Sequence, residues 1–368
     1  MNIFTIGWLL ILYGIVALFS VSIHESFTLT LWWGDPSNYF YFLRQLRNIA
    51  VGVVIARFVY KTPLATIRSR RYIILGVVLV VTLLLFSPLG IELNGARLRL
   101  QVPVLGTLQP GEFFKLGFVL LVSDWLIRKK ALLNSFAWFM SFGIVTGLCY
   151  FLFLLLRDNG TILILWLVSL ILYWYLWGKK RYVLMLIGWW IIAWFLIVSQ
   201  VNYVRDRFEA FINPNSDQWW TRSTWQVKNA LLAVGGWGLW GKWYGKGLQK
   251  FGYIPEAQSD YIFAAYSEEV GLIGNSILIG LYVWLILFFL LQLKYVRDDY
   301  LRAVGVGCIS LIVIQAFINI WVNINILPST GLTLPFISFG GTAIMVNLIE
   351  LVLLHKILVE GKGLKKLY

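Results

Sequence analysis

Residues 3–23 read IFTIGWLLILYGIVALFSVSI and contain no charged side chain. A helix rises 1.5 Å per residue, so a helix of this length is about 30 Å long, which matches the hydrocarbon core of a bilayer. No Lys or Arg precedes the run, and no small-residue cleavage site follows it. These residues are therefore predicted to form a retained transmembrane helix and not a removed signal peptide.

Further apolar runs of similar length follow along the chain. They are residues 45–60, 72–88, 112–127, 136–156, 161–177, 182–200, 263–292, 302–323 and 336–358. Arg57 interrupts the first of these, and Glu268 and Glu269 lie near the start of 263–292. The expected fold is an all-α polytopic membrane protein of about ten transmembrane helices, with residues 1–368 forming a single domain.

The overall composition supports this fold class. Apolar residues make up 60% of the chain and charged residues 13%, whereas soluble domains have about 45–50% and 25%. Cys149 and Cys308 both lie in apolar runs, which argues against a disulfide framework or a zinc site. No basic stripe lies outside the short loops, so nucleic acid is not an expected partner.

The net charge of +14 is unevenly distributed along the chain. With the N-terminus in the cytoplasm, the short inside loops and the tail contain 17 Lys and Arg residues. The short outside loops contain only Arg44, Arg47, Arg97, Arg99 and Arg157. The positive-inside rule therefore places both termini in the cytoplasm.

The segment between the seventh and eighth spans, residues 201–262, is an exceptionally long outside loop. It contains seven basic residues, five acidic residues and six Trp. A long loop in a tightly looped protein is typical of a functional segment. Within it, residues 222–234 are predicted to form an amphipathic helix on the outer membrane face, with Trp225 and Leu232 toward the lipid.

Residues 326–341, ILPSTGLTLPFISFGG, break the helical pattern without any charge. Pro328, Gly331 and Pro335 exclude a continuous helix. Irregular backbone at membrane depth is tolerated only where it lines a cavity or is packed in protein. This segment is therefore expected to border a cavity.

Ionisable residues within the spans are functional candidates because their burial is costly. Glu112 and Lys115 are three residues apart on one helical face and can pair. The pair is either a structural link between helices or the charged floor of an outward-facing cavity, whose mouth Arg97 and Arg99 would make more positive. The pattern alone leaves both interpretations open.

Residues 254–263, IPEAQSDYIF, place Glu256 and Asp260 at the outer end of the eighth span. Partial desolvation there raises the pKa of a carboxyl, which suits a general base acting on a sugar hydroxyl. A simple N-cap of the eighth helix is an equally good account of Asp260.

Taken together, these segments resemble the SEDS family (shape, elongation, division and sporulation), the RodA/FtsW peptidoglycan polymerases. Residues 255–263, PEAQSDYIF, are close to the family's P-E-A-H-T-D-F-I-F. The other similar segments are DPSNYF at 35–40 with RQ at 44–45, NGAR at 94–97, QPGEFFK at 109–115, DNGT at 158–161, EEVG at 268–271 and TGLTLPFISFGG at 330–341. The chain departs from the family where Leu98 and Arg99 replace Arg-Trp, Gln258 replaces His and Arg157 replaces Pro.

The resemblance implies an enzyme of the bacterial cytoplasmic membrane that polymerises lipid II into glycan strands, during division or elongation, with division slightly favoured. It implies Asp260 as the catalytic general base, and a class B penicillin-binding transpeptidase and other division or elongation membrane proteins as partners. No metal ligand is assigned, and a divalent cation such as Mg²⁺ or Mn²⁺ is left open. The residues expected to bind substrate or line the cavity are Glu112, Lys115, Arg97, Arg99, Glu256, Ser259, Lys228, Lys242 and Ser338.

Two other functions fit a protein with many spans and one large outer loop. One is a flippase for lipid II or another lipid-linked sugar, and the other is a different undecaprenyl-linked polymerase or ligase. A flippase needs polar groups that reach both faces, whereas the unusual residues here concentrate on the outer side. The second alternative does not account for the segment around Asp260.

Overall fold

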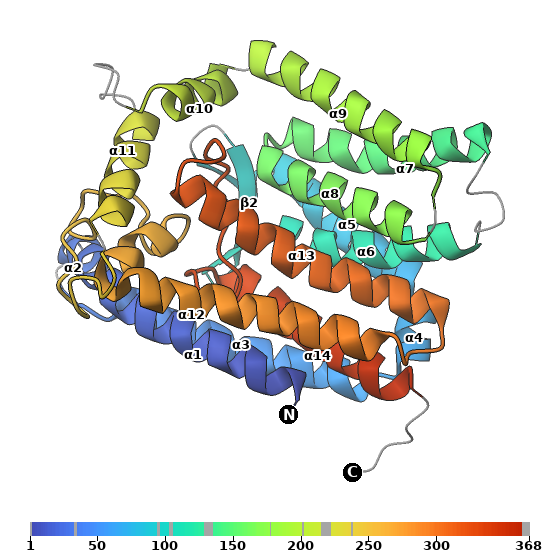
Figure 1. The fold of residues 1–368 in the computed structure, drawn as a ribbon, viewed down its shortest axis with the longest axis horizontal. Coiled ribbons are helices and arrows are strands. Elements are labelled where there is room, and N and C mark those ends of the chain that lie inside the picture. Colours follow the sequence, from blue (N-terminus) through green and yellow to red (C-terminus); the bar gives the residue numbers. More distant parts are fainter. Residues whose placement is uncertain are drawn as a thin grey trace.

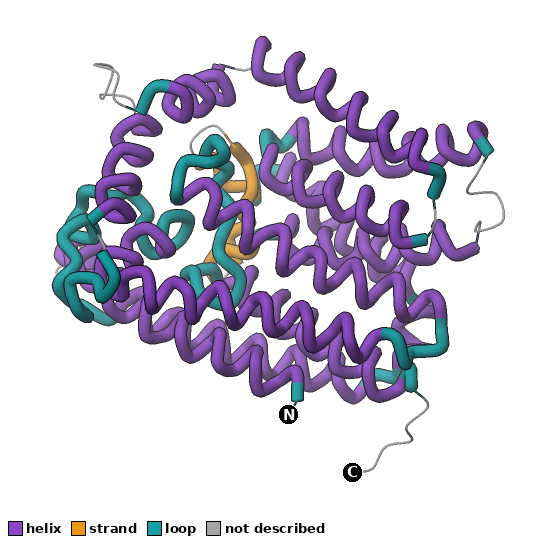
Figure 2. The backbone as a smooth tube through the Cα atoms, viewed as in Figure 1, coloured by secondary structure: helices purple, strands orange, loops and turns teal. Residues whose placement is uncertain are grey.

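Helices form most of the molecule in its computed structural model (Figures 1 and 2). The structure describes residues 2–32, 35–93, 96–102, 106–128, 135–176, 178–200, 202–214, 222–236 and 238–362. Several predicted features lie outside the described residues: Asn94, Gly95, Lys129, Lys130, Trp219, Trp220, Trp237, Lys365 and Lys366, and the side chain of Arg222.

Each of the predicted apolar runs overlaps a helix. In chain order these helices are α1 (Ile3–Val21), α3 (Phe40–Lys61), α5 (Arg71–Leu83), α6 (Pro110–Arg128), α7 (Phe136–Leu155), α8 (Asn159–Tyr175), α9 (Lys180–Gln200), α12 (Ile262–Leu293), α13 (Asp299–Asn323) and α14 (Gly341–Glu360). By length and composition, α1, α7, α12, α13 and α14 can cross a membrane, and residues 71–86 and 159–175 form shorter apolar helices. The polytopic helical fold is confirmed, whereas the number of membrane crossings stays a prediction.

The last predicted span begins later in the structure than expected. Residues 336–340 are not helical, and α14 starts only at Gly341. Pro335 precedes this stretch, and Phe336 has a left-handed backbone with φ of 66°. A bulky residue in that region does not continue a helix. The irregular backbone predicted for residues 326–341 is confirmed.

A small sheet accompanies the helices of this predominantly α-helical fold. Strands β1 (Gly90–Leu93), β2 (Ala96–Val102) and β3 (Gly106–Leu108) form an antiparallel sheet in the order β1-β2-β3, where the sequence predicted only a polar loop. The register pairs Glu92 with Arg97 and Leu100 with Leu108. Apolar and polar residues alternate along β2, which is the period of a strand with two different faces.

The long segment between α9 and α12 folds into two helices followed by a series of turns. They are α10 (Asn202–Ile212) and α11 (Arg222–Gly235), and α11 confirms the helix predicted at 222–234. Thr224, Val227 and Ala230 on α11 are buried. In Figure 1, α9, α10 and α11 form an arch that returns the chain toward α12 and α2 (Ile23–Leu31).

The last two long helices occupy the middle of the bundle. Within the apolar windows of α13 and α14, 83% and 89% of the residues are buried, against 28% in α7. Neighbouring helices, including α1, α3, α6, α8 and α12, surround this central pair. The second half of the irregular segment between α13 and α14, residues 334–338, is buried beside this pair, whereas residues 326–331 are partly or fully exposed.

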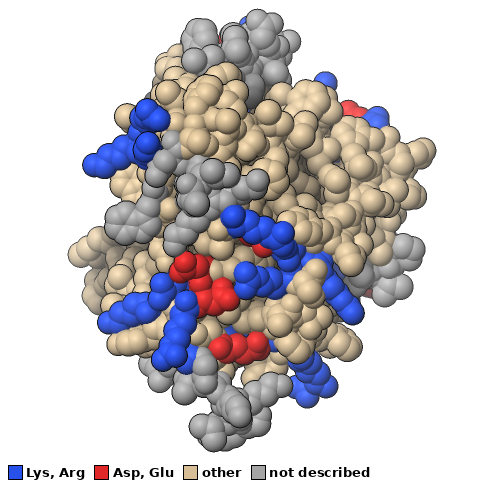
Figure 3. All heavy atoms as spheres, turned by 90° about the vertical axis from the view of Figure 1, so that its right-hand side faces the viewer, with Lys and Arg blue, Asp and Glu red and all other residues tan. Residues whose placement is uncertain are grey.

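Exposed basic side chains gather at one end of the bundle. Figure 3 looks at this end, which includes α4 (Leu64–Ser69) and the turn between α12 and α13. The exposed basic residues in or next to the loops that the sequence assigns to the cytoplasm include Lys61, Arg70, Lys180, Arg181, Lys294 and Arg297.

Candidate functional site

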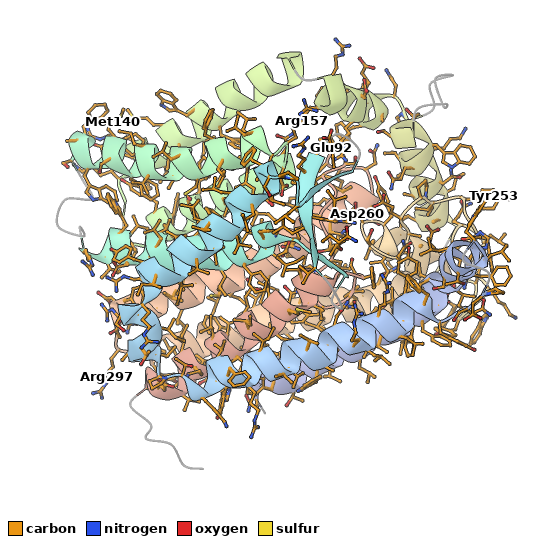
Figure 4. All side chains as sticks on the ribbon, turned by 180° about the vertical axis from the view of Figure 1, so that it is seen from behind. Glu92, Met140, Arg157, Tyr253, Asp260 and Arg297 are labelled. Carbon is orange, nitrogen blue, oxygen red and sulfur yellow. The ribbon has the colours of Figure 1, made fainter. Side chains whose placement is uncertain are left out.

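A cavity of about 710 Å³ lies beside the small sheet, at the end of the bundle away from this basic surface. Figure 4 shows Asp260, Arg157 and Glu92 around the sheet, and Met140 and Arg297 at the opposite end of the helices. The walls come from β1 and β2, from α6, α8, α9 and α10, and from the segments before α12 and α14. Segments distant in sequence therefore build one site.

The cavity wall has a charged part and an apolar part. The charged side chains are Arg99, Glu112, Arg157, Asp158, Arg207, Glu256 and Asp260. The large apolar side chains are Ile91, Leu98, Leu163, Trp190, Ile191, Val204, Phe208, Phe211, Ile326, Leu327 and Leu332. Such a wall suits an amphipathic ligand with an anionic group and a hydrocarbon portion.

Two asparagines of α13 hold the backbone of Asp260. Asn319 and Asn323 each donate a side-chain N–H to its carbonyl oxygen, at 2.8 and 3.0 Å. The side-chain oxygen of Asn323 also accepts a hydrogen bond from the backbone N–H of Ala264, at 2.9 Å. Asn323 thus satisfies an amide of the first turn of α12, whose N-cap residue is Tyr261. The structure gives no support to the N-cap interpretation of the Asp260 side chain.

Arg207 is a cavity residue that the sequence interpretation did not select. Its Nη1 donates to the carbonyl oxygen of Ser329 at 2.9 Å. A Cβ atom on Gly331 would lie 3.5 Å from Asp260 Oδ2 and 3.9 Å from Arg207 Nη2, so both side chains border the same glycine. One signal was present in the sequence, because Arg207 precedes Phe208 and Phe211 in an amphipathic stretch.

The environment of Asp260 raises its pKa to about 6, through burial and the negative charge of Glu256. The positive charges of Arg207 and Arg99 act in the opposite direction. The carboxyl therefore titrates just below neutral pH, where a general base is most effective because it is ionised and still accepts a proton. Burial lowers the pKa of Arg207, and the charge of Asp260 opposes this shift.

The structure gives Glu112 and Lys115 both of the roles that their spacing left open, a structural link between helices and a charge at the cavity. Lys115 Nζ lies 2.8 Å from Glu112 Oε2 and donates to Gln315 Oε1 of α13 at 2.6 Å. Gln315 in turn donates to the carbonyl oxygen of Thr333, at 3.0 Å. Glu112 and Thr333 line the cavity, whereas Lys115 is buried behind them. The pair ties α6 to α13 and also supplies a carboxylate to the cavity wall.

The segment between α13 and α14 borders the cavity, as its broken pattern predicts. Residues 326–333 all contribute to the lining. Ser338 Oγ donates to the carbonyl oxygen of Ser259 at 2.5 Å and accepts from the N–H of Leu334 at 2.8 Å. These bonds fix this segment to the turn that presents Asp260.

The structure brings only part of the predicted set to the cavity lining. Asp260, Glu112, Arg99 and Glu256 line it, whereas Lys115, Arg97, Ser259, Ser338, Lys228 and Lys242 do not. Arg97 pairs with Glu92 across the β1–β2 register at 3.0 Å. Lys242 pairs with Glu268 of α12 at 2.7 Å. Arg97 and Lys242 therefore each pair with a nearby carboxylate and stay outside the lining of this cavity, and a role for them in substrate binding stays a prediction.

Within the described part of the chain, no three His, Cys, Asp or Glu side chains are grouped so that they could hold a metal ion. The carboxylates of the cavity lie instead among arginines.

The fold and the site define a class of polytopic membrane protein with an amphipathic, carboxylate-containing cavity near one end of its helices. A family model described as "Cell cycle protein", which covers the FtsW, RodA and SpoVE proteins, matches residues 1–363. The chain belongs to this FtsW/RodA/SpoVE family, which is the SEDS family that its motifs resemble.

Individual relatives match over nearly the whole chain. The chain is 33% identical over 369 residues to a protein of Alcanivorax borkumensis named probable peptidoglycan glycosyltransferase FtsW, covering 97% of this chain and 92% of that protein. A protein of Thiomonas intermedia with the same name is 31% identical, covering 99% and 90%. Stage V sporulation protein E of Bacillus subtilis is 30% identical over 332 residues, covering 86% and 87%.

Solved structures share the fold. One chain, from a study titled "Structural coordination of polymerization and crosslinking by a peptidoglycan synthase complex", matches with a TM-score of 0.75 and 22% identity, covering 96% of this chain and 97% of that one. The rod shape determining protein RodA of Thermus thermophilus matches with a TM-score of 0.69 and 21% identity, covering 98% and 96%.

Proposed function

We propose that this protein is a peptidoglycan glycosyltransferase that polymerises lipid II, with Asp260 as the general base. Relatives of similar length, at 31% and 33% identity, are named for the glycosyltransferase activity. The observation that carries the proposal is the position of Asp260 in a cavity with one charged and one apolar wall. Lipid II likewise has a charged part and an apolar part, because a pyrophosphate joins its sugars to a polyprenyl chain.

In the proposed reaction, Asp260 accepts the proton from the 4-hydroxyl of the acceptor sugar. The hydroxyl oxygen forms a bond to the anomeric carbon of the donor, and the bond from that carbon to the pyrophosphate oxygen breaks. The pyrophosphate leaves with the electron pair, and the proton ends on Asp260. General-base assistance of this kind is worth about 10²–10⁴ in rate.

The arginines of the cavity are proposed to stabilise the charge that develops on the pyrophosphate. Arg99, Arg157 and Arg207 all reach the lining. Guanidinium groups suit this role because they are always charged and bind phosphate oxygens in pairs. A fixed cation aimed at developing charge lowers the barrier without reorganisation during the reaction.

The apolar wall is proposed to receive the first isoprene units of the lipid. Leu163 of α8, Trp190 and Ile191 of α9 and Phe208 of α10 contribute to it. Because α8 and α9 match predicted spans, this wall lies where a polyprenyl chain approaches from the bilayer. The sugars would then occupy the charged part of the cavity.

The basic end of the bundle is proposed to face the cytoplasm of a bacterial cell, with both termini on that side. Excess Lys and Arg in short loops favours this orientation, and the cavity then lies on the outer side, where glycan strands are made. A crosslinking class B penicillin-binding transpeptidase is the proposed partner, since one structural match comes from a complex that combines polymerization and crosslinking. The FtsW names of the relatives favour a role in division.

The test is polymerisation of purified lipid II, with products separated on a gel. Asp260→Ala and Asp260→Asn are expected to lose at least about 10²-fold in rate, while expression and membrane insertion are kept. The matched control is Asp299→Asn, an exposed carboxylate at the start of α13, which should polymerise normally. Near-normal polymer from both Asp260 variants would remove this residue from the mechanism, and no polymer from the wild type would contradict the proposed activity itself.

A further inference from the structure

The turns that follow α11 expose an unusual number of large apolar side chains. We define residues 238–253 as the aromatic loop. Its exposed side chains are Leu239, Trp240, Trp243, Tyr244, Leu248, Phe251 and Tyr253. Trp240 and Trp243 are 69% and 70% exposed. Scattered exposed apolar residues are normal, but a contiguous group marks a contact with a protein or a membrane.

Buried ion pairs hold this loop in one conformation. Lys250 Nζ lies 2.6 Å from Glu269 Oε1 and donates to Ser20 Oγ of α1 at 2.9 Å. Glu269 Oε2 accepts from Ser20 Oγ at 2.6 Å and from the backbone N–H of Gly245 at 3.0 Å. Both charged groups are almost inaccessible to solvent. The exposed rings are therefore presented by a backbone that is fixed to α1 and α12.

The aromatic loop also contacts α12 at the point where this helix is interrupted. Gly271 has non-helical angles (φ 65°, ψ −165°) in the middle of that helix. The N–H groups of Leu272 and Ile273 donate to the carbonyls of Gly238 and Leu239, at 3.1 and 3.2 Å. The two backbones touch, since a Cβ on Gly271 would lie 2.3 Å from the Gly241 nitrogen. The loop thus replaces the hydrogen bonds that the break removes.

The contacts with α12 and α1 determine where the aromatic loop lies along the axes of these two helices. Residues 270–293 contain no charged side chain, and as a helix they extend about 36 Å, enough to cross the hydrocarbon core. The loop meets α12 where this run begins. On the other side, Tyr244 Oη donates to the carbonyl of Val16 of α1, at 3.1 Å. The aromatic loop therefore lies beside the first residues of the apolar run of α12 and beside the second half of α1.

The residues of the loop suit the boundary between hydrocarbon and headgroups of a membrane. Trp and Tyr are enriched at membrane–water interfaces, and Lys reaches lipid phosphates from there. Lys246 is exposed within the loop. Trp243 has a left-handed backbone with φ of 73°, a conformation that is unfavourable for a bulky residue. The contacts that fix the loop to α1 and α12 therefore hold an exposed Trp in a strained conformation.

We propose that the aromatic loop is a membrane-interface anchor. Trp240 and Trp243 enter the boundary between headgroups and acyl chains of the leaflet on the cavity side, and Lys246 contacts lipid phosphates. The loop leads directly into residues 254–260, so the anchor holds Asp260 at a constant height above the lipid. The proposal does not depend on the reaction proposed above.

The test measures the immersion of the loop by spin labelling. Trp240→Cys and Trp243→Cys are each made in a Cys149→Ser, Cys308→Ala background and reconstituted in nanodiscs of phosphatidylglycerol and phosphatidylethanolamine. Power saturation compares collisions with oxygen, which enters lipid, and with a water-soluble nickel chelate. Ile277→Cys on α12 and Arg297→Cys at the basic end, both exposed positions, are the lipid and water references.

An oxygen-to-nickel ratio at positions 240 and 243 severalfold above that of Arg297→Cys, and near that of Ile277→Cys, supports the anchor. A ratio equal to that of Arg297→Cys overturns it, because the loop is then in water and available to a soluble partner. Labels shielded from both reagents also overturn it, since protein then covers the loop. Should the Cys variants not fold, brominated-lipid quenching of the wild type is compared with the W240F/W243F variant, and an unchanged quenched fraction rejects the proposal.

Discussion

The side chains of Asp260 and Arg207 both lie next to Gly331. A methyl group on Gly331 would lie 3.5 Å from Asp260 Oδ2 and 3.9 Å from Arg207 Nη2. Asp260 belongs to the turn before α12, Arg207 to α10, and Gly331, with a left-handed φ of 73°, to the segment between α13 and α14. Three parts of the chain thus bring a carboxylate and a guanidinium together at the cavity wall, and the positive charge of Arg207 lowers the pKa of Asp260.

Removal of the Arg207 charge should shift the pH dependence of polymerisation. Arg207 lowers the pKa of Asp260, against the effects of burial and Glu256. Without it, the pKa of Asp260 rises, and the ionised base is lost at a higher pH. An opposite charge at close range typically lowers the pKa of a carboxyl by about 1–3 units. The acid limb of kcat/KM for Arg207→Gln should therefore move upward by about one unit or more.

Two matched variants separate this charge effect from a structural role. Arg207→Lys keeps the positive charge and should retain much of the wild-type profile. Arg205→Gln, on the same helix but in an exposed pair with Glu209, should leave the acid limb unchanged. A fall in rate by the same factor at every pH in Arg207→Gln, with no shift of the acid limb, would show that Arg207 does not control the ionisation of Asp260.

The ionised side chain of Asp260 should lower the stability of the folded protein at neutral pH. Its pKa of about 6 in the folded protein lies above the usual value of 3.8, so the unfolded state ionises first and the folded protein loses stability as the pH rises from about 4 to 6. Below about pH 4 the carboxyl is neutral in both states and the cost disappears. Asp260→Asn should therefore be more stable than the wild type at pH 8, by about 1–3 kcal/mol, with no gain at pH 4.

The comparison is made by thermal unfolding in detergent across this pH range, followed by tryptophan fluorescence. The expected signature is a gain in melting temperature that is absent at pH 4, grows between about pH 4 and pH 6, and stays constant at higher pH. An equal gain at pH 4 and pH 8 would attribute the effect to packing and not to the charge of Asp260.

The buried pair of Glu112 and Lys115 should show strong coupling. Lys115→Met leaves the Glu112 carboxylate unpaired inside the protein, which typically costs about 3–5 kcal/mol. Adding Glu112→Gln removes that charge and should recover more than half of the loss. The readout is thermal unfolding of both single variants and the double variant.

The exposed pair of Arg97 and Glu92 is the matched control, because both side chains are about half exposed. Arg97→Met should cost no more than about 1 kcal/mol. If the loss of stability in the Glu112–Lys115 double variant equals the sum of the losses in the two single variants, the two residues act independently and the coupling is refuted.

Two glycines of the aromatic loop should respond differently to substitution by alanine. Gly241 and Gly245 both have a left-handed φ, of 69° and 81°. A Cβ at Gly241 would lie 2.3 Å from the Glu269 carbonyl oxygen, whereas Gly245 has open space around it. Gly245→Ala should cost about 1 kcal/mol from backbone strain alone. Gly241→Ala should cost severalfold more, because the loop must move away from α12.

Unfolding temperatures of these two variants, compared with the wild type, give the measurement. Equal losses would mean that the contact between Gly241 and α12 contributes nothing, and that only the backbone conformation matters.

Local sequence patterns were sufficient for the helical framework. An apolar run of about 20 residues specifies a membrane helix wherever the rest of the chain lies, because the bilayer and not a neighbouring segment provides its environment. Pro328 and Pro335 likewise exclude a helix by the geometry of their own rings. The same local reasoning predicted a cavity beside the broken segment 326–341, but it left a structural role open for both Asp260 and Glu112, and only the resemblance to the SEDS family favoured a catalytic role for Asp260.

Only the tertiary structure decided which charges meet. Arg207 reaches Asp260 because α10 folds back across the bundle, and no pattern within α10 contains that information. Lys242 lies within the basic outer loop that the sequence predicts, and the close contact of this loop with α12 gives it Glu268 as a partner. Periodicity and hydropathy describe a residue's own segment, whereas the partner of a buried charge depends on contacts between segments far apart in the chain.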